Sequence, residues 1–337
     1  MQRIYALAGI VVILAIALGF FYYSDGDSAK GTRLGEDRDF KVAELEAISK
    51  VFISDRAGNA TTLTKSGDAW MVNDQYPANS SAMENLMQAV EQIEMQYIPA
   101  NKAIPNIVKN LATEGIHVEI FAAGDRKIKG YYIGGSTADE RGTFAIMEGA
   151  EQPYVVHIPG WVGNVRFRYN LVGDDWRSKI LFQENLANID LVSIEYPTQR
   201  NKSFVLERGS DGYAIGPFYE TGQPTRKLSV GRAEQYLSAY ESVYLSAYAN
   251  HAVQEKAELL RRNPFATLRI SRSDGSETSI KLFPRLNSEY EAADPNTDAF
   301  VSQVQEAGWN LLLNDDADFV TASSQMIQPL LVSYTSF

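Results

Sequence analysis

Few residues in this sequence are of the types that carry out chemistry. The chain has no cysteine, which excludes disulfides, thiol nucleophiles, iron–sulfur clusters and zinc sites built on cysteine. Its three histidines, His117, His157 and His251, lie far apart and lack the spacing of metal ligands. His157 falls in an apolar strand pattern and is interpreted as structural, whereas His117 and His251 are expected at the surface. The sequence predicts no metal site and no cofactor.

Carboxylates offer the next candidates for chemistry. Two carboxylates can perform acid–base catalysis when they face each other, but adjacent acids in loops are usually solvated or cap helices. Asp175 is therefore predicted to cap a helix. The phosphate-binding G-x-x-x-x-G-K-[ST], the nucleophile motif G-x-S-x-G and the zinc motif H-E-x-x-H are all missing from the sequence, so neither an enzyme nor a nucleotide-binding protein is predicted. The adjacent acids are Asp139-Glu140, Asp174-Asp175 and Asp315-Asp316.

Aromatic residues and arginines gather in one segment, residues 161–177. Such residues commonly anchor protein interfaces, because they combine large contact area with directed hydrogen bonds. They could also bind a sugar or an anionic group by stacking and charge. In a third interpretation both tryptophans belong to the core and the arginines pair with Asp174, Asp175 or Glu184. The candidate residues are Trp161, Arg166, Arg168, Tyr169, Trp176 and Arg177.

Tyrosines recur every four residues in a predicted helix over residues 229–248. Tyr236, Tyr240 and Tyr244 are candidates for a partner or ligand surface, and Tyr248 continues the stripe. A tyrosine has an apolar ring and a polar hydroxyl, so such a stripe suits either the rim of a core or a recognition surface. Both interpretations remain open.

The elements that would position these residues recur along the chain. Alternating apolar and polar residues predict strands joined by turns, and apolar residues at steps of three and four predict helices. Ser80 or Ser81 is expected to cap the first helix and Ser229 the second. Corresponding elements are separated by 143 to 150 residues, which predicts an internal duplication. The pairs are strands in 48–74 and 191–217, helices 80–95 and 229–248, and strands in 117–135 and 266–284.

The predicted fold class is α+β, with two tandem, mainly antiparallel sheet-plus-helix units after a transmembrane helix. Strands are expected in 143–150 and 153–160, and 161–182 is expected to link the units. A long loop is predicted over 287–300, a helix over 301–313 and a closing strand or helix over 319–337. The predicted domains are an anchor (1–23), a tether (24–40), a first unit with its linking segment (41–188) and a second unit (189–337).

The N-terminal segment predicts a membrane anchor. Residues 4–23 carry no charge and are long enough, as a helix, to span a bilayer. Aromatic residues stand at both ends of this run, as at membrane interfaces, and its length and its four bulky aromatic residues at the end disfavour signal-peptide cleavage there. Basic residues lie on both sides, but the short segment before Arg3 suits a cytoplasmic tail. We expect a single-pass protein of the cytoplasmic membrane with its bulk in the periplasm.

Several ordered motifs resemble a known family. They are the run from Asp55 to Ala78, PYVVHIPGWVG (153–163), RFRYN (166–170), DDWRSKILF (174–182) and IDLVSIEYP (189–197). Together they resemble the bacterial domain-of-unknown-function family 4340, in its Bacteroidota form, over most of residues 40–285. The resemblance implies a membrane-anchored, non-cytoplasmic protein, whose relatives are often encoded near gliding-motility-type ABC transporters and are regarded as auxiliary subunits. It assigns no catalytic residue.

These observations predict a non-enzymatic auxiliary or scaffold protein of a cell-envelope complex, with ABC transporter subunits as candidate partners. The alternative is a periplasmic module that binds a glycan, a peptide or a lipid. The formal net charge of -11 disfavours binding to nucleic acid, because the chain would repel a phosphate backbone.

Overall fold

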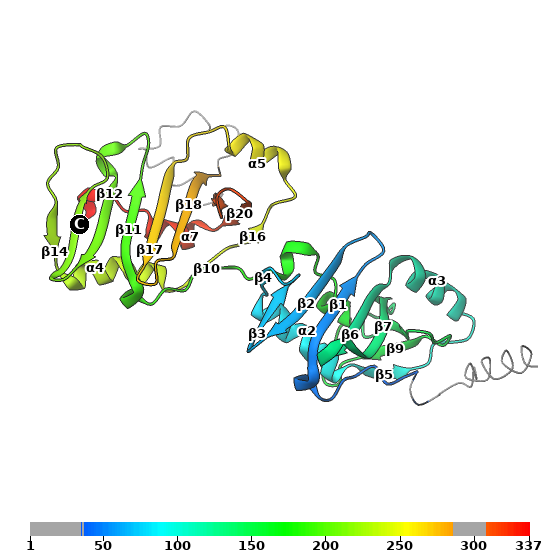
Figure 1. Ribbon diagram of the computed structural model, residues 1–337. Coiled ribbons are helices and arrows are strands. Elements are labelled where there is room, and N and C mark those ends of the chain that lie inside the picture. The colour runs from blue at the N-terminus through cyan, green and yellow to red at the C-terminus, as the bar shows by residue number, and fades with distance from the viewer. Residues whose placement is uncertain (1–34, 36, 286–307) are drawn as a thin grey trace, which may run out of the picture. The chain divides into compact units, whose positions relative to one another are not determined.

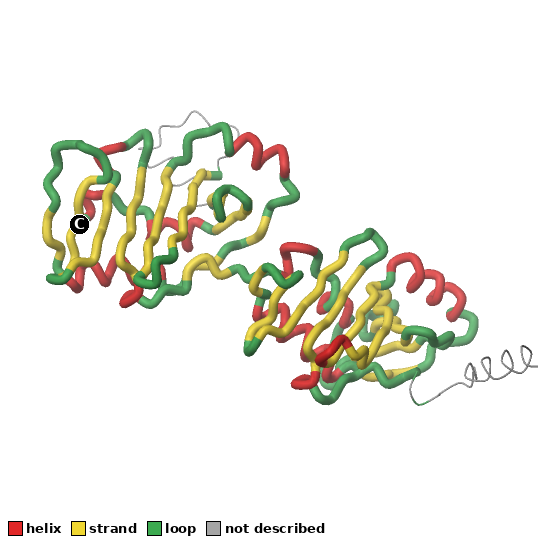
Figure 2. The backbone as a smooth tube through the Cα atoms, viewed as in Figure 1, coloured by secondary structure: helices red, strands yellow, loops and turns green. Residues whose placement is uncertain are grey.

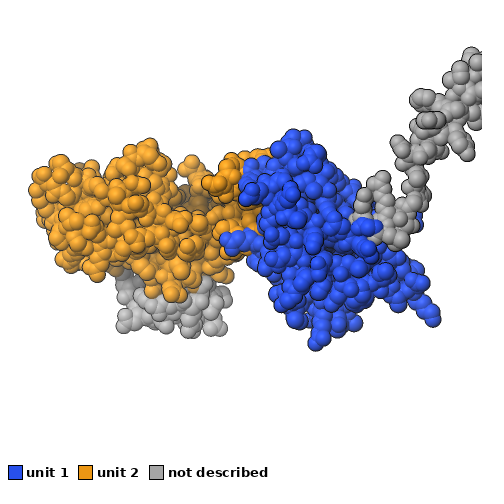
Figure 3. Space-filling model, turned by 90° about the horizontal axis from the view of Figure 1, so that it is seen from below, with its two compact units in different colours: residues 1–65, 84–170 blue, residues 66–83, 171–337 orange. Residues whose placement is uncertain are grey.

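The computed structural model describes residue 35, residues 37–285 and residues 308–337. The predicted transmembrane helix, most of the tether and the predicted loop 287–300 lie outside these residues. None of the helices in the described ranges has the length and hydropathy needed to cross a bilayer. The chain forms two compact units, coloured in Figure 3: unit 1 (residues 1–65 and 84–170) and unit 2 (residues 66–83 and 171–337).

The first large sheet has nine strands in the order β4-β3-β2-β1-β6-β7-β8-β9-β5 (Figure 1). Two helices accompany it, α2 (Ser80–Gln92) and α3 (Ile104–Glu114). The strands are β1 (Ile48–Ser54), β2 (Ala60–Ser66), β3 (Ala69–Val72), β4 (Tyr76–Pro77), β5 (Glu94–Tyr97), β6 (Ile116–Ala122), β7 (Arg126–Ser136), β8 (Thr143–Met147) and β9 (Tyr154–His157).

The second large sheet also has nine strands, in the order β14-β13-β12-β11-β17-β18-β19-β20-β16. Its strands are β11 (Ile189–Glu195), β12 (Phe204–Gly209), β13 (Gly212–Pro217), β14 (Arg226–Leu228), β16 (Ala247–Tyr248), β17 (Ala266–Arg272), β18 (Glu277–Pro284), β19 (Trp309–Leu313) and β20 (Asp318–Ala322). Its helices are α4 (Val230–Leu237), α5 (Val253–Leu259) and α7 (Ser324–Ile327). A small separate sheet pairs β10 (Ile180–Phe182) with β15 (Val243–Tyr244).

The two large sheets repeat one topology. If their strands are matched in chain order, the two sheet orders are the same. The register is the same as well, because Val51 pairs with Ile120 on β6, and Val192 pairs with Ile270 on β17. Strands dominate both units and helices are few (Figure 2). The predicted α+β class with mainly antiparallel sheets is confirmed.

The helix α2 must cross one face of the first sheet, because it connects the edge strand β4 to the opposite edge strand β5. Its apolar stripe is buried, as the periodicity predicts: Met83, Leu86, Val90 and Ile93 are at most 4% exposed. A stripe of this kind gains roughly 2 kcal/mol for each large side chain removed from water. The hydrophobic core of unit 1 therefore includes the interface between this helix and its sheet.

The caps of the two long helices differ from the prediction. The side chain of Asn79, rather than Ser80 or Ser81, accepts a hydrogen bond from the backbone N–H of Ala82 at 3.2 Å. Ser229 does precede α4, but its side chain makes no capping hydrogen bond. Asparagine and serine are comparable N-caps, so the residue type alone does not fix the capping position.

The predicted helix over 229–248 is wrong beyond residue 240. The chain forms α4, then the 3-10 turn η8 (Ser238–Tyr240), and then the short strands β15 and β16. Long-range pairing explains the change, since Tyr244 pairs with Ile180 and Val243 with Phe182. Helix propensity is a weak preference that tertiary contacts override.

The predicted helix over 301–313 is also wrong where the structure describes it, because Trp309–Leu313 forms β19. All five residues of this strand are buried, between β18 and β20. A strand buried on both faces gives a continuous apolar run, which periodicity cannot distinguish from a buried helix. The closing segment 319–337 contains both a strand and short helices, as predicted.

Candidate functional site

The predicted interface segment, residues 161–177, divides between the two units after residue 170. Its first part contains the 3-10 turn η4 (Val165–Arg168), whose entry is capped by Asn164 through a hydrogen bond from the N–H of Arg166. Its second part contains the 3-10 turn η5 (Gly173–Trp176). Each part is therefore a site of its own unit.

Three of the predicted residues in unit 1 are fixed by internal bonds. The guanidinium of Arg166 donates to the backbone oxygens of Ile133 and Glu114, at 3.0 and 2.7 Å. Arg168 is buried and donates to the side-chain oxygen of Gln88 at 2.6 Å. Tyr169 is completely buried, and burial raises the pKa of its hydroxyl well above the usual range. Arg168 and Tyr169 therefore present almost no accessible surface.

An accessible aromatic cluster remains at the start of the segment. We define the Trp161 cluster as Trp161, Val162 and Phe167. Val162 is 78% exposed and Phe167 46% exposed, and the rings of Trp161 and Phe167 lie 5.6 Å apart. The guanidinium of Arg168 lies 5.2 Å from the Trp161 ring and 5.4 Å from the Phe167 ring, within cation–π range.

Gly163 lets the indole of Trp161 lie against the backbone. A Cβ at this glycine would stand 2.5 Å from the Trp161 ring, and its φ of +143° is one that other residues rarely adopt. The ring is therefore held in place before any partner binds. Preorganisation of this kind reduces the entropy that an interface loses on binding.

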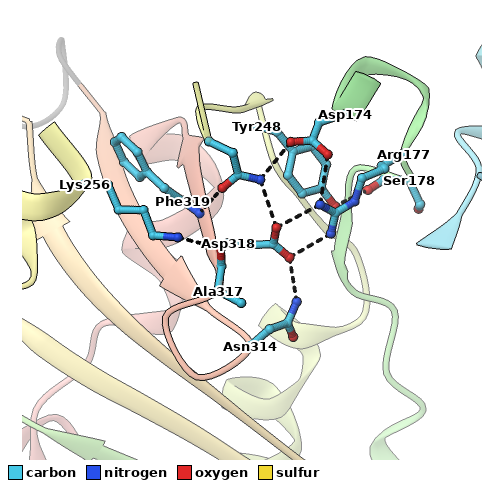
Figure 4. A network of polar contacts seen from close by, with 10 residues as sticks. Asp174, Arg177, Ser178, Tyr248, Lys256, Asn314, Ala317, Asp318 and Phe319 are labelled. Carbon is cyan, nitrogen blue, oxygen red and sulfur yellow. Dashed lines mark hydrogen bonds and ion pairs between the residues drawn. The ribbon is translucent and has the colours of Figure 1, made fainter. Parts of the chain in front are cut away.

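Arg177, which lies in unit 2, belongs to a buried polar network (Figure 4). The two terminal nitrogens of Arg177 donate to the two carboxylate oxygens of Asp318, at 2.8 and 2.7 Å. Arg177 also donates to Asp174 at 3.1 Å, which confirms the structural interpretation for this arginine. The rings of Tyr76 and Tyr248 flank the guanidinium, at 3.6 and 4.1 Å from its carbon.

Amide side chains complete the network. Asn250 donates to Asp318 at 3.0 Å and to Asp174 at 2.8 Å, and its oxygen accepts from the backbone N–H of Phe319 at 2.7 Å. Asn314 donates to the other oxygen of Asp318 at 2.8 Å. Each carboxylate oxygen of Asp318 thus accepts two hydrogen bonds, as a buried charge requires.

The electrostatics of the network stabilise both charges. Burial alone would raise the pKa of the Asp318 carboxyl, but hydrogen bonds from Arg177, Asn250 and Asn314 and the charge of Arg177 lower it to about 2. Burial would also lower the pKa of Arg177, and the hydrogen bonds to Asp318 and Asp174 raise it instead. Through these bonds to both terminal nitrogens of Arg177 and both carboxylate oxygens of Asp318, the network holds η5 and β20 together.

Trp176 is not accessible to a partner, and Asp175 does not have its predicted role. Trp176 is completely buried, and its indole N–H donates to the backbone oxygen of Leu171 at 2.8 Å. Asp175 lies inside η5 rather than at its N-cap, so the predicted capping role is wrong. The N-cap position is Val172, without a capping side chain.

The three candidate tyrosines separate in the structure. Tyr236 and Tyr240 are buried, and their hydroxyls lie 2.5 Å apart. Tyr236 also donates to the backbone oxygen of Leu330 at 3.1 Å. Tyr244 lies on β15 and is 44% exposed. Two of the three therefore serve the core of unit 2, and only Tyr244 is accessible.

Sequence reasoning included Asp174 as a partner of Arg177 but missed the rest of this network. Asp318 is 141 residues away from Arg177, and Asn250 and Asn314 lie in loops without a motif. Only the folded sheet brings these residues together, so no local signal identifies them.

The fold and these sites define an α+β protein with two nine-stranded, mainly antiparallel sheets of the same topology. The family model described as "Domain of unknown function (DUF4340)" matches residues 70–264, and the chain belongs to this family. The match lies within the range of the resembling motifs, which confirms the resemblance. No curated protein matches the chain.

Proposed function

We propose that this protein is a non-enzymatic auxiliary or scaffold protein of a cell-envelope complex, anchored in the cytoplasmic membrane by residues 4–23. Its two units would stand in the periplasm and bind envelope proteins. Subunits of a gliding-motility-type ABC transporter are the proposed partners. The two units would descend from one duplicated ancestor, which the repeated topology and register support.

The observation that carries this proposal is the Trp161 cluster. Large exposed apolar residues on a soluble unit commonly belong to interaction surfaces. Here the exposed side chains of Val162 and Phe167 lie beside the partly buried ring of Trp161, over a buried arginine. Tryptophan and arginine are the residue types most enriched among those that dominate interface energies.

Affinity purification tests the proposal. The tagged full-length protein is extracted from its native membrane in mild detergent, and co-purifying proteins are identified by mass spectrometry. A variant with Val162→Glu and Phe167→Glu places charges in the cluster. A matched control, Val253→Glu, changes a valine of α5 that is 69% exposed in unit 2. Thermal unfolding checks that both variants fold.

We expect envelope subunits to co-purify with the wild type and with Val253→Glu but not with the cluster variant. Loss of an interface anchor commonly costs about 2 kcal/mol, or roughly a 30-fold weaker complex. Equal recovery with all three proteins would show that the cluster is not the partner surface. If no envelope protein co-purified with the wild type, the scaffold function itself would be wrong.

A cavity in unit 2 supports the alternative function, a ligand-binding module. Its volume is about 600 Å³, within the range of roughly 300–1,000 Å³ typical of small-molecule sites. It lies between α4 and the C-terminal segment, and its lining is both polar and apolar. Native mass spectrometry would detect a bound glycan, peptide or lipid. The substitution Ala239→Trp should abolish this binding, because the larger side chain would fill the cavity. The lining includes Arg232, Gln235, Tyr236, Ala239, Val332 and Phe337.

A further inference from the structure

Three potential metal ligands meet on one face of the sheet of unit 1. His117 and Glu119 are two residues apart on β6, so their side chains leave the same face. Glu119 pairs with Gly130 on β7, and the backbone N–H of Glu148 bonds the oxygen of the same Gly130 at 2.9 Å. Glu119 and Glu148 therefore flank Gly130 from opposite sides.

The donor atoms converge above this glycine. One ligand atom of each of His117, Glu119 and Glu148 lies within 4.8 Å of the others. The Nε2 atom of His117 lies 3.9 Å from the Glu148 carboxylate. This nitrogen is buried, and within the described parts of the chain it has no hydrogen-bond partner. The sequence-based expectation of a surface histidine is wrong in this respect, since the side chain of His117 is only 20% exposed.

Stacking fixes the imidazole of His117 in this orientation. The ring lies parallel to the Tyr132 ring, with centroids 4.5 Å apart and 16° between the planes. The guanidinium of Arg56 lies 5.2 Å from the centre of the Tyr132 ring. A ligand that is oriented before the ion arrives loses little freedom on binding it.

Gly130 provides the space in which the donors meet. A glycine in the interior of a long strand weakens it, and commonly marks a close approach by another group. A Cβ at Gly130 would overlap the Glu148 carboxylate and would stand 2.9 Å from Cε of Lys127. The charged side chains of Glu148 and Lys127 therefore occupy the space that a side chain at this position would fill.

Lys127 now supplies the positive charge in this space. Its Nζ donates to Glu119 at 2.6 Å and also to Glu148. The side chain is 36% exposed and lies on a flexible stem, so it can turn outward into solvent. An ion pair at this exposure contributes little to stability. A cation of higher charge can therefore replace the ammonium without breaking a strong interaction.

We propose that His117, Glu119 and Glu148 form a binding site for a divalent transition-metal ion of the zinc class. One imidazole and two carboxylates suit such an ion, and three protein ligands leave a coordination position open for water or for a ligand. Metal–ligand bonds of about 2.0–2.2 Å at tetrahedral angles place ligand atoms about 3.4 Å apart. The 3.9 Å between His117 and Glu148 needs only a small closure.

The second unit lacks this ligand set. The shared register places Thr267 at the position of His117 and Arg269 at that of Glu119, since each pairs with the corresponding strand in the same way. Ile146 on β8 and Leu312 on β19 occupy the same register position, since they pair with Tyr132 and Lys281. Glu148 and Asn314 each follow these residues by two positions and therefore correspond to each other. The repeated sheet itself thus does not require the three ligands, which are specific to unit 1.

Metal titration of the purified full-length protein in detergent tests the site. Isothermal calorimetry measures Zn²⁺ binding, and Co²⁺ absorption in the visible region reports the coordination number. His117→Gln removes the nitrogen ligand at similar size. Lys127→Met removes the competing ammonium, and Gly130→Ala fills the space with a methyl group. Lys50→Met, which removes a lysine paired with the exposed Asp125, is the matched control. Circular dichroism checks the fold of each variant.

We expect one Zn²⁺ ion per chain. His117→Gln should weaken binding by more than about 100-fold, since even outer-shell changes at metal sites cost 10–100-fold. Lys127→Met should tighten binding by up to about tenfold, Gly130→Ala should weaken it, and Lys50→Met should leave it unchanged. Absence of stoichiometric binding in both the wild type and Lys127→Met would overturn the proposal. Binding that His117→Gln leaves unchanged in a folded protein would overturn it as well.

Discussion

The buried pair of Arg177 and Asp318 should be a main determinant of the stability of unit 2. Their side chains are 6% and 7% exposed, and two hydrogen bonds join them. In Asp318→Asn the shape stays almost the same, but the guanidinium keeps only Asp174, whose side chain is 35% exposed, as a charged partner. Removing one partner of a buried pair costs about 3–5 kcal/mol. Because Asp174 remains, we expect about 3 kcal/mol.

The same pair should make stability depend on pH. The pKa of Asp318 is about 2 in the folded protein, below its ordinary value of 3.8. A carboxyl pKa that is lower in the folded than in the unfolded protein stabilises the folded state at pH values above the unfolded pKa. This contribution is lost as the pH falls from about 4 through 2. At 1.36 kcal/mol per pKa unit, the difference corresponds to about 2 kcal/mol.

Urea unfolding of the purified protein, followed by tryptophan fluorescence, measures both effects. Trp176 and Trp309 lie in unit 2 and report its unfolding. The control Asp211→Asn removes an ion pair with Lys227 whose side chains are 78% and 80% exposed, and it should leave stability nearly unchanged.

At neutral pH, Asp318→Asn should be about 3 kcal/mol less stable than the wild type, and this difference should shrink by about 2 kcal/mol near pH 2. A loss below 1 kcal/mol at neutral pH, or a difference that is independent of pH, would refute the reasoning.

Three further changes should have graded effects. Gly134→Ala should destabilise unit 1 by about 1–3 kcal/mol, because its Cβ would stand 2.8 Å from a leucine of α3, whereas Gly135→Ala, with open space around it, should be neutral in chemical denaturation. Tyr236→Phe should cost about 2 kcal/mol, since its hydroxyl donates to the backbone oxygen of Leu330 and accepts from the hydroxyl of Tyr240, and Tyr240→Phe should cost about 1 kcal/mol in the same assay. In the cysteine-free chain, Ser28→Cys should react with a membrane-impermeant maleimide from the periplasmic side; labelling only from the cytoplasmic side would reverse the proposed topology.

The elements with clear periodicity were predictable from the sequence. The helix α2 follows the predicted position, because an amphipathic stripe acts locally. The recurrence of elements at a nearly constant offset also indicated the topology that the two sheets share.

Elements that depend on distant partners were not predictable. Val243 and Tyr244 leave the expected helix because they pair with β10, about 60 residues earlier in the chain. The strand β19 resembles a helix in sequence because both of its faces are buried. Local composition favours the helix in both cases, and long-range pairing decides against it.

The candidate sites show the same division. The enrichment of aromatic residues over 161–177 does not separate the partly buried Trp161 from the completely buried Trp176. The proposed ligands His117, Glu119 and Glu148 give no motif, because the first two lie on β6 and the third follows β8. Only the sheet register brings such residues together.

Site-specific photo-crosslinking in the native membrane tests the central claim most directly. A photoreactive phenylalanine analogue replaces Val162 in the Trp161 cluster, and the same analogue at Val253 is the control. Irradiation should link an envelope protein, in the proposed case an ABC transporter subunit, to position 162 and not to position 253. Crosslinks that are equal at both positions, or absent at position 162, would contradict the proposal that this cluster binds a partner.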